Sequence, residues 1–256
     1  MRLFGCHLLK KLPEPRFKGV LYIVSTLILS CSSAYANFKC AEKDSLSPGE
    51  GKFNQERPIA KAYQIKTVVI DAGHGGYDPG CLGSDSKEKE ITLAIAQKLE
   101  GLLREAFPEI QVVMTRKDDT FVPLYERATL ANRLQADLFI SIHCNTMPPG
   151  PRSAGIYGTE TYVMGLHTAD HNLQVAKREN ASILLENDYQ QNYDYDPDSP
   201  EGHILFSMYQ NAFLDQSIRL AEAVENSFGS NGRSSRGVKQ AGFVVLKSTA
   251  MPSILI

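Results

Sequence analysis

The chain has 256 residues, of which 43% are hydrophobic and 22% are charged, and its formal net charge is −2. This composition is that of an ordinary globular protein. The absence of a basic stripe or a Lys/Arg block excludes the usual electrostatic signature of nucleic-acid binding, so we expect no nucleic-acid partner.

The N-terminus has the three parts of a secretory signal peptide. A basic stretch, Arg2 to Lys18, precedes the short apolar run Val20 to Leu29, and small residues ending in Ala34-Tyr35-Ala36 follow. The apolar run is too short to span a bilayer comfortably, which favours a cleaved signal over a membrane anchor. A lipid anchor on Cys31 is less favoured, because a bulky leucine stands where such signals have a small residue. We therefore expect an exported protein, located in the periplasm or cell envelope.

The sequence divides into three parts, with the signal assigned to residues 1–36. Residues 37–64 are polar, and we interpret them as a linker with little structure. Residues 65–256 have strong hydrophobic periodicity, and we expect them to form one domain. Three cysteines follow the signal: Cys40, Cys81 and Cys144. This odd number and the lack of a C-x-x-C pair argue against a regular disulfide framework and against a thiolate zinc site.

Strands and helices alternate in the first half of this domain. The spacing of apolar residues predicts strands at Thr67–Ile70, Gln111–Thr115 and Asp137–Ile142, and helices at Glu90–Phe107 and Leu124–Leu134. The order β-α-β-α-β predicts a single α/β domain of phosphorylase/hydrolase-like type, with a mostly parallel central sheet and helices on both faces.

The second half is less regular. We predict a strand at Gly155–Met164, a helix at Ala169–Glu186, a loop at Asn187–Gly202, a long helix at Ile204–Phe228, and strands at Gly242–Lys247 and Ser253–Ile256. The last residues are apolar and have no polar tail after them. A buried strand at a chain end is unusual, so we interpret the sequence as truncated at its C-terminus.

Two histidines follow two predicted parallel strands. His74 lies in the segment Asp71–Gly76, directly after the first strand, and His143 directly follows the third. The carboxyl ends of parallel strands are the edge where α/β proteins place their sites. Glycines on both sides of His74 leave room for a ligand beside its imidazole. Two equivalent placements favour a pair of metal ligands over isolated turn residues.

A third ligand is needed, because a hydrolytic zinc site has three protein ligands and one open position. Glu88 and Glu90 both qualify, since they lie at the entry to the first predicted helix. Carboxylates there also stabilise the helix dipole, so spacing alone does not choose between them.

Four ordered segments carry a resemblance to a known family. VVIDAGHGGYDPGCLG, KEKEITLAIAQKL, FVPLYERATLANRLQADLFISIHCN and GVKQAGFVVL…MPSILI resemble the zinc-dependent N-acetylmuramoyl-L-alanine amidases of the amidase_3 type. The match runs from Lys66 to Ile256. The resemblance implies that one Zn²⁺ per chain is bound by His74, Glu88 and His143, while Glu90 keeps the role of a helix-start residue.

The resemblance also implies a substrate and a mechanism. The substrate is the amide that joins muramic acid to L-alanine in peptidoglycan. Zinc activates water, and a glutamate directly after the last strand acts as general base. That position follows Ile256, so no catalytic base lies within residues 65–256, the zinc amidase domain. We expect metal binding with poor turnover, since loss of one acid/base group costs about 10²–10⁴-fold in rate.

Other polar residues receive lesser roles. We expect Arg127 and Asn132 to brace the edge of the site, and Asn145 is a candidate donor to substrate. Cys81 and Cys144 are predicted to be small buried residues rather than ligands. Three histidines are interpreted as surface residues: His167, His171 and His203.

Residues 179–193 form an insert with two possible roles. In some relatives, a helix inserted here covers the zinc and is moved by an activator protein. Glu186 and Asp188 have carboxylates that could reach the open zinc position. We favour a wall of the substrate groove or a family-specific loop, and keep the cover and its activator as the alternative.

Two other functions remain open. A zinc exopeptidase usually has two metals bridged by Asp, and the sequence contains no second ligand set. A non-catalytic wall-binding or regulatory module is supported by the missing base. The number of zinc ions per chain distinguishes the exopeptidase from an amidase. A glutamate codon directly after Ile256 would favour the amidase over the non-catalytic module.

Overall fold

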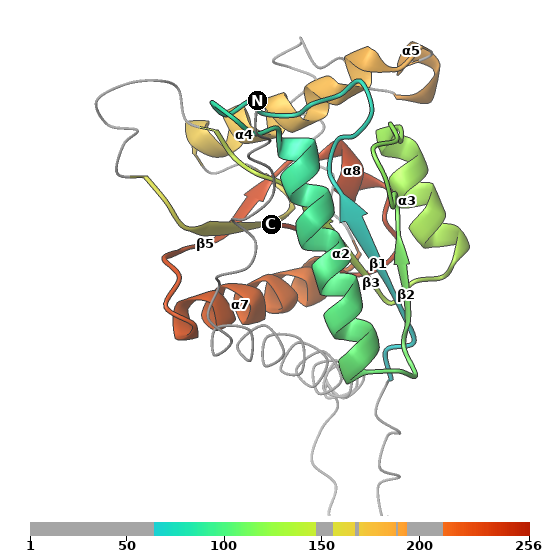
Figure 1. The fold of residues 1–256 in the computed structure, drawn as a ribbon, viewed down its shortest axis with the longest axis vertical. Helices are drawn as coiled ribbons and strands as arrows, with labels where there is room; N and C mark the ends of the chain where they lie inside the picture. The colour runs from blue at the N-terminus through green and yellow to red at the C-terminus, as the bar shows by residue number, and fades with distance from the viewer. Residues whose placement is uncertain (1–63, 147–155, 167–168, 188, 194–211) are drawn as a thin grey trace, which may run out of the picture.

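The computed structural model describes residues 64–146, 156–166, 169–187, 189–193 and 212–256 (Figure 1). The predicted signal and nearly all of the predicted linker lie outside these residues. Cys40, His167, Asp188 and His203 lie outside them as well. No described helix has the length and apolar composition needed to cross a bilayer.

A six-stranded sheet forms the centre of the molecule, in the order β2-β1-β3-β6-β4-β5. The strands are β1 (Thr67–Ala72), β2 (Gln111–Met114), β3 (Leu138–Ile142), β4 (Thr159–Met164), β5 (Ser235–Ala241) and β6 (Ser253–Leu255). All neighbouring strands are parallel except β4 and β6, which meet antiparallel at Tyr162 and Leu255. The predicted mostly parallel sheet is confirmed.

Helices cover both faces of this sheet, as predicted. The helices are α2 (Glu88–Ala106), α3 (Leu124–Arg133), α4 (Asp170–Asn180), the 3₁₀ helix η5 (Ala181–Leu185), α5 (Tyr189–Asn192), α7 (Leu214–Ser230) and α8 (Val244–Lys247). Residues of α2 and α7 join one core cluster, on the face where Figure 1 shows α2 lying along β1. Residues of α3, α4, η5 and α8 join the second cluster, on the other face.

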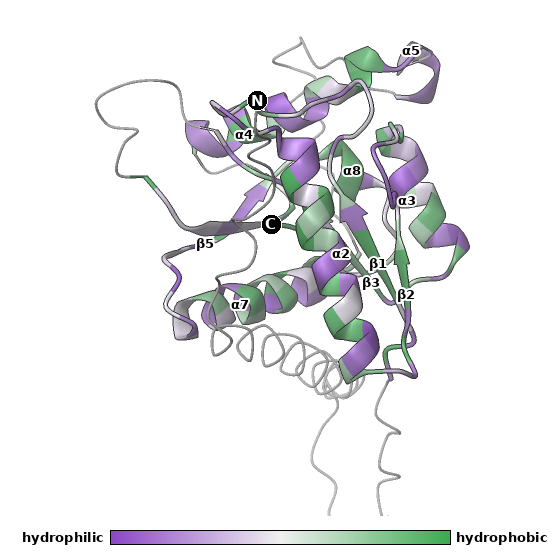
Figure 2. Ribbon diagram, in the orientation of Figure 1, coloured by the Kyte–Doolittle hydropathy of each residue, from purple (hydrophilic) through white to green (hydrophobic). Residues whose placement is uncertain are grey.

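The position of strand β1 between two core clusters explains why its sequence is continuously apolar. Val68 and Ile70 pack into the first core cluster, and Val69 packs into the second. A strand covered on both faces cannot alternate apolar and polar residues. Figure 2 shows hydrophobic residues gathered on the central strands, whereas the helices mix both kinds.

The second half departs from prediction in several places. The short helix α5 lies within the segment predicted as a loop, Asn187–Gly202. The segment predicted as a strand at Gly242–Lys247 contains the short helix α8, and the preceding strand is β5. Phe243 to Leu246 are all buried, and a short buried apolar run fits a strand or a helix equally well. The predicted helix at Ala169–Glu186 is divided into α4 and η5.

The long predicted helix is confirmed in its described part, and one strand was not predicted. Helix α7 extends to Ser230 and begins at Leu214, and residues 204–211 of the predicted helix lie outside the described part. Strand β5 was missed because it lies at the edge of the sheet and is largely half-buried, so it lacks a strong apolar pattern.

Candidate metal centre

The turn after β1 brings backbone close to the histidines. His74 has a φ of 60°, in the left-handed region that few non-glycine residues adopt. A Cβ on Gly73 would lie 2.4 Å from Cε1 of His143, and a Cβ on Gly80 would lie 2.6 Å from Cδ2 of His74. Side chains at these two glycines would therefore displace the imidazoles.

Four side chains meet at this edge of the sheet: His74, Glu88, His143 and Glu179. One ligand atom from each lies within 4.8 Å of the others. Nε2 of His74 and Nδ1 of His143 each lie 3.2 Å from Oε1 of Glu88. The same nitrogens lie 3.2 Å and 2.9 Å from Oε2 of Glu179. The three residues expected to bind metal are thus brought together, and a fourth joins them.

The chemistry of this cluster fits a metal ion. All four side chains are at most 6% exposed, and Nε2 of His74 has no hydrogen-bond partner. A buried polar atom without a partner is costly, which a bound cation would explain. Two imidazoles with carboxylates are also a donor set found in hydrolytic zinc sites. Within the described residues, no second group of His, Cys, Asp and Glu has such an arrangement.

Burial distinguishes Glu88 from Glu90. Glu88 is the first residue of α2 and is 2% exposed, whereas Glu90 lies on the exposed side of the helix. Backbone N–H groups of Cys81 and Cys144 donate to the two carboxylate oxygens of Glu88 at 2.8 Å and 2.7 Å. These contacts hold the Glu88 carboxylate beside the histidines. Sequence spacing alone could not distinguish Glu88 from Glu90.

Cys81 and Cys144 contribute their backbone to the site. Both are free thiols and are half-buried, so the prediction that they are buried was wrong. Burial, together with the nearby carboxylates of Glu88 and Glu179, raises the pKa of Cys81 to about 12 and that of Cys144 to about 11. The thiols therefore stay protonated near neutral pH and are poor metal ligands.

Asp78 orients His74. Its Oδ2 lies 2.8 Å from Nδ1 of His74, which directs Nε2 into the cluster. The same oxygen accepts a hydrogen bond of 2.8 Å from the hydroxyl of Ser182 in η5. Sequence analysis missed Asp78, although a carboxylate four residues after the ligand histidine was the available signal.

Electrostatics inside the cluster favour charged histidines when no cation is bound. Burial lowers the pKa of His74, but the hydrogen bond with Asp78 and the nearby carboxylates of Glu179 and Glu88 outweigh it and raise this pKa to about 12. Burial also opposes protonation of His143, yet Glu179 and Glu88 raise its pKa to about 9. Burial and these histidines act in opposite directions on the Glu88 carboxyl, and the histidines hold its pKa well below its usual range.

A buried network supports the turn that carries His74. Asp71 is fully buried and accepts hydrogen bonds from Arg127 at 2.8 Å, Ser141 at 2.6 Å and Thr115 at 2.7 Å. Arg127 also donates to the backbone carbonyl of His74 at 2.9 Å. Arg127 therefore has the bracing role that we predicted.

Asn132 acts on another part of the same edge. Its Nδ2 donates to the carbonyl of Ser248 at 2.6 Å, and its Oδ1 accepts from the amide of Ala250 at 2.8 Å. These bonds hold the segment that leads into β6. Asn132 also has the expected structural role.

The insert supplies Glu179 to the cluster, and Glu186 does not reach it. Glu186 lies away from the cluster, because its Oε1 accepts from the amide of Leu124 at 2.9 Å and from the hydroxyl of Tyr193 at 2.8 Å. Asn180 anchors the end of α4, since its side chain bonds the backbone of the segment that begins α8. The expectation for Glu186 was wrong because packing of α4 sets which carboxylate faces the histidines.

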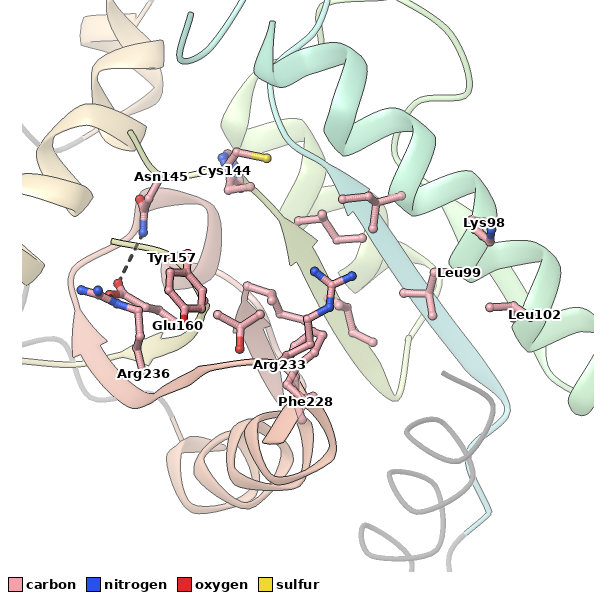
Figure 3. A pocket seen from close by; sticks show the side chains of 18 of the residues that line it. Lys98, Leu99, Leu102, Cys144, Asn145, Tyr157, Glu160, Phe228, Arg233 and Arg236 are labelled. Atoms are coloured by element: carbon pink, nitrogen blue, oxygen red, sulfur yellow. Dashed lines mark hydrogen bonds and ion pairs between the residues drawn. The ribbon is translucent and has the colours of Figure 1, made fainter. Parts of the chain in front are cut away.

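Beside the cluster lies a cavity of about 660 Å³ (Figure 3). Asn145 lines it and is exposed, with its Nδ2 3.4 Å from Oε2 of Glu160. His171 is partly buried and lies 3.6 Å from the same oxygen, so it is not the free surface residue that we predicted. The donor role proposed for Asn145 stays a prediction.

Comparison with known proteins identifies the family of this chain. The Amidase_3 profile, described as N-acetylmuramoyl-L-alanine amidase, matches residues 68–256. The chain belongs to the Amidase_3 family. The resemblance drawn from the four sequence segments is thereby confirmed.

Several relatives illustrate the extent of the match. The chain is 33% identical over 212 residues to the amidase AmiC of Escherichia coli, covering 82% of this chain and 47% of AmiC. It is 34% identical over 193 residues to AmiA of Escherichia coli strain K12, covering 75% of this chain and 64% of AmiA. A solved structure, the catalytic domain of CwlV from Bacillus (Paenibacillus) polymyxa, has a TM-score of 0.45 and 29% identity, covering 75% of this chain and 78% of that one. The chain thus spans about half the length of AmiC and somewhat less than two thirds of AmiA.

Proposed function

We propose that this chain is the catalytic domain of an exported, zinc-dependent N-acetylmuramoyl-L-alanine amidase. It would hydrolyse the amide between N-acetylmuramic acid and L-alanine in peptidoglycan. The observation that carries the proposal is the buried cluster of His74, Glu88 and His143 in an Amidase_3 chain. The export step is supported by the signal-like sequence at the N-terminus.

Each residue has a distinct part in the mechanism. His74, Glu88 and His143 would hold the zinc, and Asp78 would keep the His74 ring in place. Zinc supplies water activation at neutral pH and polarisation of the scissile carbonyl. The family resemblance puts the general base directly after Ile256, whose carbonyl accepts a hydrogen bond of 2.8 Å from the amide of His143. A carboxylate at that position would therefore lie beside the ligands.

We further infer that Glu179 covers the centre in the resting protein. Its Oε2 lies 2.9 Å and 3.2 Å from the two histidines, in the space that water and substrate would need. A partner protein that displaces α4 would then act as activator. This placement favours a cover over the groove wall that the sequence led us to prefer.

The zinc centre is tested by metal analysis of purified protein. We expect one zinc per chain in the wild type and in Glu90→Ala, whose carboxylate is exposed, and loss of zinc in His74→Ala. Retention of stoichiometric zinc by His74→Ala would contradict the assignment. Two zinc ions per chain would support an exopeptidase.

The reaction is tested separately with labelled peptidoglycan. An amidase releases stem peptides that have L-alanine as a free N-terminus and leaves the glycan strands intact. The assay uses protein that carries the glutamate expected after Ile256. Zinc-loaded protein of this kind that binds peptidoglycan without releasing these peptides, even after Glu179→Ala, would support the non-catalytic module instead.

A further inference from the structure

The cavity beside the metal centre has an uneven distribution of polar groups. It starts at His143 and Asn145 and extends over the sheet face between α2 and α7. Figure 3 shows Asn145, Glu160 and Arg236 at one end, Arg233 near the middle, and Leu99 and Lys98 on the wall formed by α2. The end next to the metal ligands therefore gathers an amide, a carboxylate and a guanidinium.

The lining of this cavity is positively charged overall. It includes Lys98, Arg233 and Arg236, and Glu160 is its one carboxylate. Glu160 is 8% exposed and is neutralised by Arg236 and by Lys239, whose Nζ lies 2.7 Å from Oε1. Arg233 adds a further cationic side chain to the lining. The cavity is thus suited to an anionic ligand.

Arg236 is held in a fixed position by Glu160. Its Nε donates to Oε1 of Glu160, while Tyr162 and Lys239 bind the same carboxylate at 2.5 Å and 2.7 Å. The terminal nitrogens of Arg236 have no partner among the described residues, and the side chain is 32% exposed. A guanidinium fixed through Nε presents its two terminal nitrogens as a preformed fork for a carboxylate.

The position of this fork relative to the metal centre suggests which carboxylate it takes. Asn145 lies two residues after the ligand His143, and its Nδ2 lies 3.4 Å from Oε2 of Glu160, which holds Arg236. All four residues line the same cavity. A stem peptide with its scissile amide at the zinc would extend its next residue, the one after L-alanine, into this part of the cavity. In peptidoglycan that residue is a glutamic acid derivative.

We propose that Arg236, positioned by Glu160, binds the free carboxylate of the second residue of the stem peptide. The proposal rests on the proposed amidase function and adds a determinant of substrate choice. Amidation of that carboxylate removes the charge that the fork recognises. The chain would therefore prefer peptidoglycan whose second stem residue is a free acid over its carboxamide form.

Binding measurements test this without requiring turnover. Two synthetic muramoyl tripeptides that differ only in carboxylate or carboxamide at the second residue are titrated calorimetrically into the zinc-loaded protein. We expect about 10-fold tighter binding of the acid, as for a charge-assisted, partly exposed contact. Arg236→Gln should lose this preference, and Arg236→Lys should keep part of it. The matched control is Arg219→Gln, an exposed arginine of α7 outside the cavity, which should keep all of it.

The outcomes separate this proposal from the amidase proposal. The same titrations are repeated in a Glu179→Ala background, so that the cover cannot mask a binding preference. Equal binding of both ligands by wild type and Glu179→Ala overturns the proposal, as does a preference that survives in correctly folded Arg236→Gln. Binding of the glycan alone, with no contribution from the peptide, overturns it too. A protein that carries the glutamate expected after Ile256 and prefers the acid, but never hydrolyses it, refutes the amidase function and retains this inference.

Discussion

Replacing Glu179 by alanine should open the metal centre. The carboxylate contacts two histidines at 2.9 Å and 3.2 Å, and both contacts are buried. A hydrogen bond to a charged group contributes about 1.5–3 kcal/mol. Loss of about 2 kcal/mol from the closed form would raise the population of the open form about 30-fold. Glu179→Gln keeps the size of the side chain and should give a smaller increase.

Amide hydrogen exchange measures this opening directly. We expect amides of α4 and η5 to exchange about 30-fold faster in Glu179→Ala, while those of β1 and β3 keep their protection. Asp170→Asn, an exposed acid in the first turn of the same helix, is the matched control and should change exchange by no more than about 5-fold, the size of a helix-dipole contribution. Unchanged exchange in Glu179→Ala, or equal acceleration in β1, would refute the idea that this carboxylate holds a local cover.

Three further changes probe the surroundings of the centre. Asp78→Asn should weaken zinc binding about 10- to 100-fold in chelator competition, because His74 loses its orienting carboxylate; unchanged affinity would contradict that role. Arg127→Met leaves Asp71 as a buried unpaired charge and should cost about 3–5 kcal/mol in urea unfolding, and a loss below 1 kcal/mol would argue against the brace. Burial raises the pKa of Glu160, but Lys239, Tyr162 and Arg236 outweigh it and lower this pKa from 4.5 to about 2. Its ionised form therefore stabilises the fold above pH 4.5, and this contribution is lost as the pH falls toward 2. Glu160→Gln should remove that part of the acid dependence of the melting temperature, and an unaltered profile would contradict it.

The two ligand histidines were predictable because strand-end placement is visible in sequence. Val68 to Ile70 form an apolar run that ends at a glycine turn, and His143 follows a second such run. Glu88 was ambiguous, since both it and Glu90 start the helix and only burial in the folded protein distinguishes them.

Other features depended on tertiary packing. Glu179 faces the histidines because Val175 and Ala176 of α4 pack into the core, and no local pattern specifies that orientation. The run Phe243–Leu246 is apolar on all sides, so periodicity could not reveal that it forms α8 rather than a strand. Family resemblance supplied the choice of Glu88 but did not point to Glu179, which lies in the insert.

The order of the ligands along the chain has a consequence for metal loading. His74, Glu88 and His143 all lie within the segment from β1 to β3, whereas Glu179 comes from the insert that follows. Synthesis and folding proceed from the N-terminus, so the three-ligand site has its parts before its cover exists. The nascent protein would then take up zinc quickly, and the finished protein would exchange it slowly. The covering carboxylate would thus retain the metal as well as exclude substrate.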